Sequence, residues 1–387
     1  MACDAVVAGH ICLDIFPDLS TSTWEKWEAG FRPGHLLETG PAIFSTGGAV
    51  PNTGLALHKL GIATRLMGKV GDDLIGQAIR QIVNSHGDVL ADEMIVDQAA
   101  CSSYTIIVNL PGVDRIFLHY PGPNNTFGAS DVPYGLVAQA RLFHFGYPPV
   151  MRRMFEDDGA ELVEMFRRVK EMGVTTSLDM TLPDPTSPAG RADWRTILRN
   201  VMPYVDIFLP SIEETLYMLR PDTYREPGAS ITPALLTELS GQLLEMGGRI
   251  VGLKLGERGL YLRTAGQTAI ETLGAARPSD PAVWAERELW APCFEVNVVG
   301  TTGAGDAAIA GFLAALLRDL SPEEALTAAV AVGACNVEAA DALSGIRSWE
   351  ETWQRIERGW ARRRLMLNAA GWGFDEEQQL WTNCEID

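Results

Sequence analysis

The chain has 387 residues, of which 47% are hydrophobic and 21% are charged, and its mean hydropathy is +0.03. These values are typical of a globular protein and allow one large domain or two ordinary ones. With 31 Lys and Arg against 50 Asp and Glu, the net charge is −19, which disfavours nucleic acids and anionic membranes as partners.

The first 46 residues predict two strands separated by a loop. Residues 5–15 have strand character with a kink at Gly9, and this strand is expected to end at Asp14. Residues 17–34 contain the Pro, Ser, Thr and Gly of a loop, and residues 35–46 predict the next strand.

A helix is predicted directly after a pair of glycines. Gly47 and Gly48 open it, its apolar positions roughly follow the helical period, and Gly61 is expected at its C-terminal end. Asn52 lies in the first turn, where its amide either caps the helix or faces a ligand.

From residue 142 to residue 209, predicted strands and predicted helices alternate. Such alternation is typical of a parallel sheet with helices on both faces. The predicted strands cover residues 64–70, 104–110, 115–120, 142–145, 175–179, 205–209, 250–255 and 260–263. Predicted helices begin near residues 73, 151, 194 and 211.

The last third of the chain predicts one strand, three helices and two irregular segments. Residues 274–292 are rich in Pro and Ala and predict a surface loop, whereas residues 294–299 predict a strand. Two of the helices are expected over 323–340 and 349–363, and the residues from 374 on show no clear period.

A turn of small residues, 300–305, follows the strand predicted over 294–299. It leads into the remaining predicted helix, which continues to Leu317. The N–H groups at a helix start and the positive end of its dipole make such a turn an anion site. Gly303 and Gly305 let the backbone approach a ligand closely. Asp306 follows just inside the helix.

The position of Asp306 has two interpretations. An acidic residue in a first helical turn is most often a stabilising cap, worth about 0.3–1 kcal/mol. A carboxylate that faces a phosphate-sized site would instead repel the anion, unless it takes a proton from a hydroxyl that attacks the bound phosphate.

Two other uses of the turn fit the sequence less well. Gly303, Gly305 and Ala308 satisfy a dinucleotide-binding pattern, but no strand with an acidic end follows about 20 residues later. A nucleoside triphosphatase P-loop would need a G-K-[ST] sequence, which the chain lacks.

The cysteines and histidines carry no recognisable spacing. None of the six cysteines forms a C-x-x-C pair and no H-x-x-x-H pair occurs, so neither a disulfide framework nor a zinc site is predicted. The chain lacks a basic segment before its first apolar stretch and any apolar run of about 18 residues, so we expect a cytoplasmic protein with reduced thiols.

Two segments together resemble the signatures of the ribokinase-like (PfkB) carbohydrate kinases. The turn and its helix read G-T-T-G-A-G-D-A-A-I-A-G-F, and residues 47–76 run from G-G-A-V-P-N to G-K-V-G-D-D-L-I-G. Further matches are the early strand that reaches Asp14, a hairpin with Arg115 followed by P-G-P-N-N, and the segments F-L-P-S-I-E-E and L-K-L-G-E-R-G.

The resemblance implies a fold and a reaction. The fold would be a three-layer α/β/α ribokinase-like domain over residues 1–346, with a mostly parallel central sheet and a small β-sheet lid from about 12–45 and 101–122. Residues 347–387 would add a C-terminal helix and a tail that pack on this domain. The reaction would be phosphoryl transfer from ATP with Mg²⁺, and a homodimer through the lid is a further hypothesis.

The resemblance also implies roles for individual residues. Asp306 would be the general base. The anion hole would be Thr302, Gly303, Ala304 and Gly305. The acceptor would be held by Asp14, Gly47, Gly48 and Asn52. The nucleotide would lie against Lys254, Gly256, Gly259 and Asn336, and Glu214 would organise the metal.

Departures from the family pattern leave the acceptor open. Ser211 stands in place of an Asn, and Gly300 in place of an Asp that helps bind a monovalent cation, so cation activation is not expected. Ala49 and Gly146 lack the ribose-binding side chains of ribokinases. The acceptor is therefore a sugar or sugar acid, or alternatively a nucleoside, and a non-catalytic sugar- or nucleotide-binding protein is the competing class.

Overall fold

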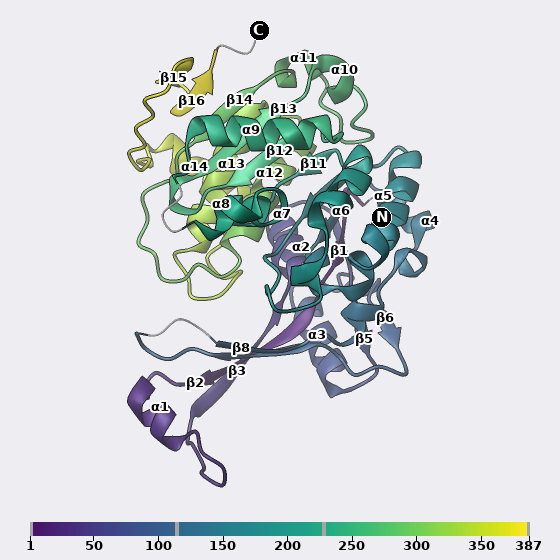
Figure 1. Ribbon diagram of the computed structural model, residues 1–387, viewed down its shortest axis with the longest axis vertical. Coiled ribbons are helices and arrows are strands. Elements are labelled where there is room, and N and C mark those ends of the chain that lie inside the picture. Colours follow the sequence, from purple (N-terminus) through teal and green to yellow (C-terminus); the bar gives the residue numbers. More distant parts are fainter. Residues whose placement is uncertain (1–2, 113–115, 227–229, 385–387) are drawn as a thin grey trace.

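The computed structural model describes residues 3–112, 116–226 and 230–384 (Figure 1). A ten-stranded main sheet runs through the body, and a four-stranded sheet, the lid sheet, projects from it. This arrangement confirms the predicted α/β architecture with a small additional sheet. Arg115, expected in the lid hairpin, lies outside the described residues.

The main sheet is parallel on one side and antiparallel on the other. Its parallel strands are, in spatial order, β4 (Thr64–Met67), β1 (Ala5–Gly9), β9 (Leu142–Gly146), β10 (Thr175–Asp179), β11 (Ile207–Phe208) and β12 (Ile250–Lys254). Its antiparallel strands are β13 (Leu260–Thr264), β14 (Glu288–Ala291), β16 (Leu380–Asn383) and β15 (Trp372–Asp375). The carboxyl ends of the parallel strands share one edge, where ligands bind in open α/β sheets.

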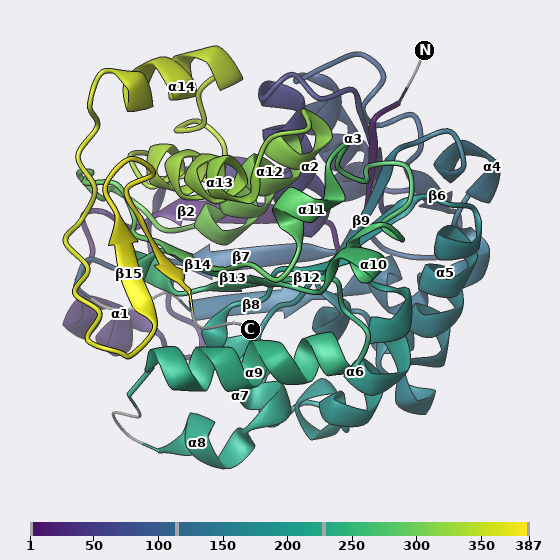
Figure 2. The ribbon, with the colours of Figure 1, turned by 90° about the horizontal axis from the view of Figure 1, so that it is seen from above.

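Helices cover both faces of the main sheet, as Figure 2 shows from above. One face carries α2 (Ala49–Lys59), α3 (Leu74–Asn84), α12 (Ala304–Leu317), α13 (Pro322–Asn336) and α14 (Trp349–Glu357). The other carries α5 (Ala160–Glu171), α6 (Trp194–Val201), α7 (Ile212–Leu219), α8 (Pro221–Arg225) and α9 (Pro233–Glu245). Strand β1 is apolar on both sides because Ala5 and Val7 pack in one core and Val6 and Ala8 in the other.

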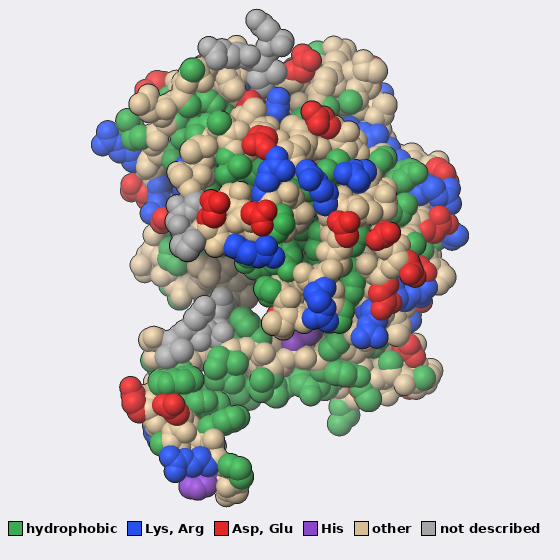
Figure 3. Space-filling view, in the orientation of Figure 1, with side chains coloured by type: hydrophobic (Ala, Val, Ile, Leu, Met, Phe, Trp, Pro, Cys, Tyr) green, Lys and Arg blue, Asp and Glu red, His purple; other side chains and the backbone are tan. Residues whose placement is uncertain are grey.

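The lid sheet has two chemically different faces. Its strands, in spatial order, are β3 (Gly40–Gly47), β2 (Cys12–Asp18), β7 (Tyr104–Val108) and β8 (Ile116–Tyr120). Asp14 is opposite Thr105, which is opposite His119, so these residues share one face, the inner face. Neighbouring positions such as Ile106 and Leu118 therefore belong to the other face, the outer face. A hollow separates the lid from the body in Figure 3.

Two N-terminal expectations are corrected by the structure. The segment expected as a loop contains α1 (Trp24–Gly30), whose N-cap Thr23 accepts a hydrogen bond from the Lys26 N–H. The early strand is two strands in different sheets, and the second continues past Asp14 to Asp18 because it pairs with both β3 and β7.

The C-terminal third differs from expectation in three places. Residues 274–292 are not a surface loop, since they contain α11 (Pro281–Trp284) and the buried strand β14. Residues 294–299 form no strand of either sheet, although Phe294 makes one β-bridge with Arg362. The tail forms the hairpin β15–β16, and β16 pairs with β14.

The remaining elements are short. They are the strand pair β5 (Lys69–Gly71) and β6 (Ile95–Asp97) and the helices α4 (Tyr134–Val137) and α10 (Gln267–Ile270). Within the described ranges, no helix is long and apolar enough to cross a membrane.

Candidate active site

The small-residue turn forms the start of α12. Gly303 is the N-cap residue with φ +72°, and a Cβ there would lie 2.6 Å from the Cβ of Ala342, so only glycine fits. The side chain of Lys254 passes beside Gly305, since a Cβ on that glycine would lie 3.6 Å from Lys254 Nζ. The turn therefore combines a helix N-terminus with an ammonium group, which together suit an anion.

Asp306 is buried and receives hydrogen bonds from three side chains. Its Oδ2 accepts from Asn52 Nδ2 at 3.1 Å and from the Tyr147 hydroxyl at 2.7 Å, and its Oδ1 accepts from Thr53 Oγ1 at 3.3 Å. Burial raises the pKa of Asp306, and the nearby Lys254 opposes this rise. A fixed carboxylate with an increased proton affinity can act as a base near neutral pH.

Tyr147 is a site residue whose role the sequence does not reveal. It follows β9 directly and has a left-handed backbone, φ 70° and ψ 44°, which is uncommon for a bulky residue. The side chain so placed reaches Asp306, 159 positions away in the chain. Sequence reasoning also missed Thr53, because a threonine inside an apolar helix gives no signal of a long-range contact.

A buried ion pair lies beside the turn. Lys254 Nζ is 2.6 Å from Asp179 Oδ1, with 14% and 1% of the two side chains exposed. Burial is the largest cause of the raised pKa of Asp179, which Lys254 counteracts. Asp179, at the end of β10, was not predicted as a site residue.

Glu214 occupies the first turn of α7 in a capping box. The Ser211 N–H donates to Glu214 Oε2 at 2.6 Å, and the Glu214 N–H donates to Ser211 Oγ at 3.1 Å. The charge of Glu214 raises the pKa of both Asp179 and Lys254, so this carboxylate also lies near the ion pair.

The predicted acceptor residues come together between the lid and α2. A Cβ on Gly47 would lie 2.1 Å from Asp14 Oδ2, so the carboxylate lies over bare backbone. Gly48 is the N-cap residue of α2, and Asn52 follows in the first turn. Asn52 uses its amide group on Asp306, while its Oδ1 has no hydrogen-bond partner within the described part of the chain. Burial raises the pKa of Asp14 to about 6.

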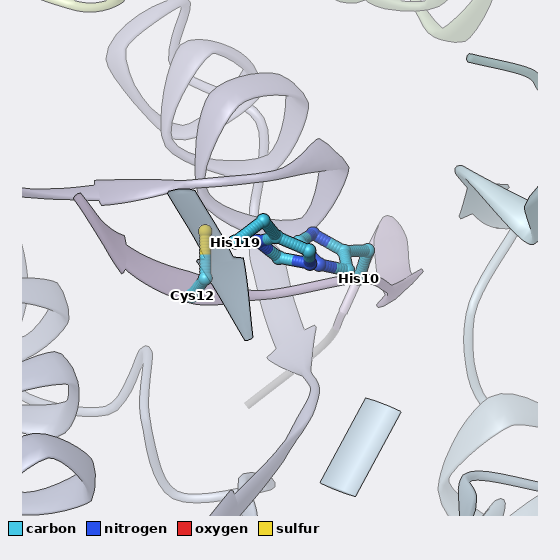
Figure 4. A group of neighbouring side chains, drawn as sticks. All are labelled: His10, Cys12 and His119. Carbon is cyan, nitrogen blue, oxygen red and sulfur yellow. The ribbon is translucent and has the colours of Figure 1, made fainter. Parts of the chain in front are cut away.

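Two histidines that were not predicted as site residues, His10 and His119, lie beside the predicted acceptor residues (Figure 4). The ring centroids of His10 and His119 are 5.3 Å apart, and the His10 ring stacks toward Tyr147 at 6.4 Å. Burial, with a smaller contribution from His119, lowers the pKa of His10 to about 3, and burial also lowers the pKa of His119. Both rings are therefore neutral at pH 7.

On the other side of the turn is a largely apolar cavity of about 340 Å³. Predicted nucleotide residues line it, namely Lys254, Gly256 and Gly259, together with Ala304 and Gly305 of the turn. Val296, Val298, Val330 and Val337 contribute to its apolar wall. The side chain of Asn336 instead donates to the Ala342 carbonyl at 2.7 Å, and this residue does not line the cavity.

Comparisons with known proteins identify a family. Residues 29–349 match the family described as pfkB family carbohydrate kinase. The chain is 27% identical over 261 residues to an uncharacterized sugar kinase of Archaeoglobus fulgidus, covering 67% of this chain and 86% of that protein. It is 25% identical over 304 residues to the probable chloroplastic fructokinase-6 of Arabidopsis thaliana, covering 73% and 67%.

The fold is also similar to a solved structure. The ribokinase of Arabidopsis thaliana complexed with ribose and ATP superimposes with a TM-score of 0.70 at 20% sequence identity. The similarity covers 92% of this chain and 99% of that chain.

Proposed function

The chain belongs to the pfkB family of carbohydrate kinases and is a phosphotransferase with an alcohol group as acceptor, and from this premise we propose that it transfers the γ-phosphoryl group of ATP to a hydroxyl of a small sugar or sugar acid. One observation carries the proposal. Asp306 lies at the start of α12, between the anion turn on one side and Asn52 on the other.

In the proposed reaction, Asp306 takes the proton of the acceptor hydroxyl as its oxygen attacks the phosphorus. The acceptor lies against Asp14, Gly47, Gly48 and Asn52, whose oxygen and nitrogen atoms suit the directional hydrogen bonds of a polyol. Positioning and charge stabilisation do most of the work in phosphoryl transfer, so the protein needs little covalent chemistry of its own.

The turn from Thr302 to Gly305 is proposed to hold the transferring phosphoryl group, with Lys254 beside it. The adjoining apolar cavity would take the adenine and ribose of ATP, and its size lies within the range of small-molecule sites. Asn336 is left outside this proposal because its amide is already bound to Ala342.

Mg²⁺ is proposed to bind near Glu214, since carboxylate oxygens suit this ion. When bound, Mg²⁺ neutralises charge on the phosphates. We propose no monovalent cation, because a Cβ at Gly300 would lie within about 3.0 Å of the Ala339 and Ala340 backbone and an Asp does not fit there without a shift.

The proposal is tested by a panel of acceptors with ATP and Mg²⁺. Ketoses, aldoses, sugar acids and nucleosides are assayed for acceptor-dependent ADP formation. A ketose or sugar acid is expected to give the highest kcat/KM. A preference for a nucleoside would favour the nucleoside kinase alternative over the sugar kinase. If no acceptor in the panel supported ADP formation, the proposed reaction would be contradicted.

The pH dependence of acceptor binding follows from Asp14. Because its pKa is raised to about 6, the carboxylate is ionised at pH 7 and becomes protonated as the pH falls through 6. Protonation removes hydrogen-bond acceptors, so the KM for the acceptor is expected to rise below pH 6. Asp14→Asn should raise the KM at pH 7 and abolish this rise, whereas the same pH dependence in the variant would contradict the assignment.

A homodimer through the outer face of the lid is a further proposal. Phe44, Ile116, Leu118 and Tyr120 are between 39% and 56% exposed, and Figure 3 shows hydrophobic side chains gathered over the lid sheet. A second copy would bury the same face on both subunits.

Leu118→Glu is therefore expected to convert a dimer to a monomer in sedimentation experiments. Met366→Glu is the control. It changes an apolar side chain that lies outside the lid and is 70% exposed, so it should leave the dimer intact. A wild-type protein that sediments as a monomer, or a dimer that tolerates Leu118→Glu, would contradict the lid interface.

A further inference from the structure

We propose that His10, Cys12 and His119 form a binding site for a divalent transition metal of the Zn²⁺ type on the inner face of the lid sheet (Figure 4). Two imidazoles and one thiolate are a ligand set that proteins use for zinc and similar ions. This inference does not depend on the proposed kinase reaction.

The three side chains are close to the geometry of such a site. Their ligand atoms all lie within 4.8 Å of one another. In a tetrahedral zinc site, bond lengths of 2.0–2.3 Å place the ligand atoms about 3.5 Å apart. A contraction of about 1 Å is therefore enough, and His119 can supply it because β8 is an edge strand of the lid sheet.

His10 supports the assignment because it is buried without a partner. Only 4% of this residue is exposed, and neither ring nitrogen has a hydrogen-bond partner among the described residues. Buried polar atoms are normally paired, since an unpaired one costs free energy. A bound metal ion would satisfy one of these nitrogens.

The surroundings hold the other two ligands. Thr105 Oγ1 is 3.0 Å from His119 Nδ1, a supporting hydrogen bond of the kind that orients histidine ligands in metal sites. Thr105 Oγ1 is also 3.5 Å from Cys12 Sγ. The Cys12 thiol donates to Asp14 Oδ1 at 3.3 Å.

The charges balance when a divalent ion binds. The Cys12 thiol gives its proton to solvent as the sulfur–metal bond forms, as metal-binding thiols do. The new thiolate and the Asp14 carboxylate together compensate the two positive charges of the ion.

The experiment is a cobalt titration of the full chain after removal of metals by chelation. One equivalent of Co²⁺ should bind and give the near-ultraviolet charge-transfer band of a cobalt–thiolate bond with the strong visible bands of tetrahedral coordination. Zn²⁺ should displace it. Cys12→Ser should lose the charge-transfer band, and Thr105→Val, which removes only a supporting hydroxyl, should weaken Co²⁺ binding by about 10–100-fold.

Matched controls separate the site from adventitious binding. Cys101→Ser removes an exposed free thiol outside the cluster and should leave the spectrum unchanged. His119→Gln removes a proposed ligand and should weaken Co²⁺ binding, and circular dichroism with thermal unfolding checks that each variant is folded. Three results would overturn the proposal. They are a wild-type chain that binds no Co²⁺, a folded Cys12→Ser variant with an unchanged spectrum, and a Cys101→Ser variant that loses the charge-transfer band.

Discussion

Asp306→Asn is expected to lower kcat by about 10²–10⁴-fold, the usual contribution of a general base, while ATP binding stays nearly unchanged. Asparagine keeps the shape of the side chain but cannot accept a proton. The hydrogen bonds from Asn52, Thr53 and Tyr147 show that the site is built around two carboxylate oxygens. The measurements are acceptor-dependent ADP formation and ATP affinity by calorimetry.

Asp319→Asn is the matched control for this substitution. Asp319 follows the C-terminal end of α12, is exposed, and uses its Oδ1 to accept from the Ser279 N–H, which an asparagine oxygen can also do. It should retain full activity. Retention of more than about one percent of kcat in Asp306→Asn would exclude Asp306 as the general base.

Lys254→Met is expected to impair both catalysis and stability, for different reasons. Removing the ammonium beside the anion turn takes away positive charge where we propose that the phosphoryl group is transferred, and losses of about 10²–10³ in kcat are typical for such groups. The substitution also leaves Asp179 buried without its partner, which typically costs about 3–5 kcal/mol in the free energy of unfolding. Denaturant unfolding and ADP formation measure the two effects.

A double variant separates these two consequences. Lys254→Met with Asp179→Asn removes both charges, so most of the lost stability should return while kcat stays low. If the double variant regained the rate, Lys254 would act only by pairing Asp179. If the single variant were as stable as the wild type, the ion pair would not contribute to stability.

The residues at the centre of the candidate site could be proposed from the sequence because they are local. The turn over 300–305, the helix after it and Asp306 are contiguous, so their relation needs no tertiary information. Gly47, Gly48 and Asn52 form a second contiguous group. Their spatial proximity to Asp306 was implied only by the family resemblance, and the contact from Asn52 to Asp306 agrees with it.

The rest of the site depends on contacts between distant segments. Tyr147 reaches Asp306 only because its backbone is left-handed after β9, and a tyrosine gives no sequence signal for that conformation. Asp179 ends a strand, as many structural aspartates do, and its pairing with Lys254 spans 75 positions. His10 and His119 are separated by more than a hundred residues, so no spacing pattern could join them.

Errors in the predicted elements have similar causes. Composition suggested a loop over 274–292, yet Leu289 and Trp290 are fully buried because β13 and β16 flank them on both sides. The apolar run over 294–299 suggested a strand, but Val296 and Val298 line the apolar cavity beside the turn instead of pairing. In both segments the tertiary environment overrides local propensity.

The pairing of β16 with β14 has a consequence for biosynthesis. About 90 residues separate the two strands in the chain. They include the anion turn and the buried helices α12 and α13. At about 5–20 residues per second, the ribosome needs on the order of 5–20 s to deliver β16 after β14. During this interval β14 presents an open edge to other nascent chains. Changes in the tail hairpin should therefore alter chaperone demand and expression yield more strongly than they alter the catalytic rate.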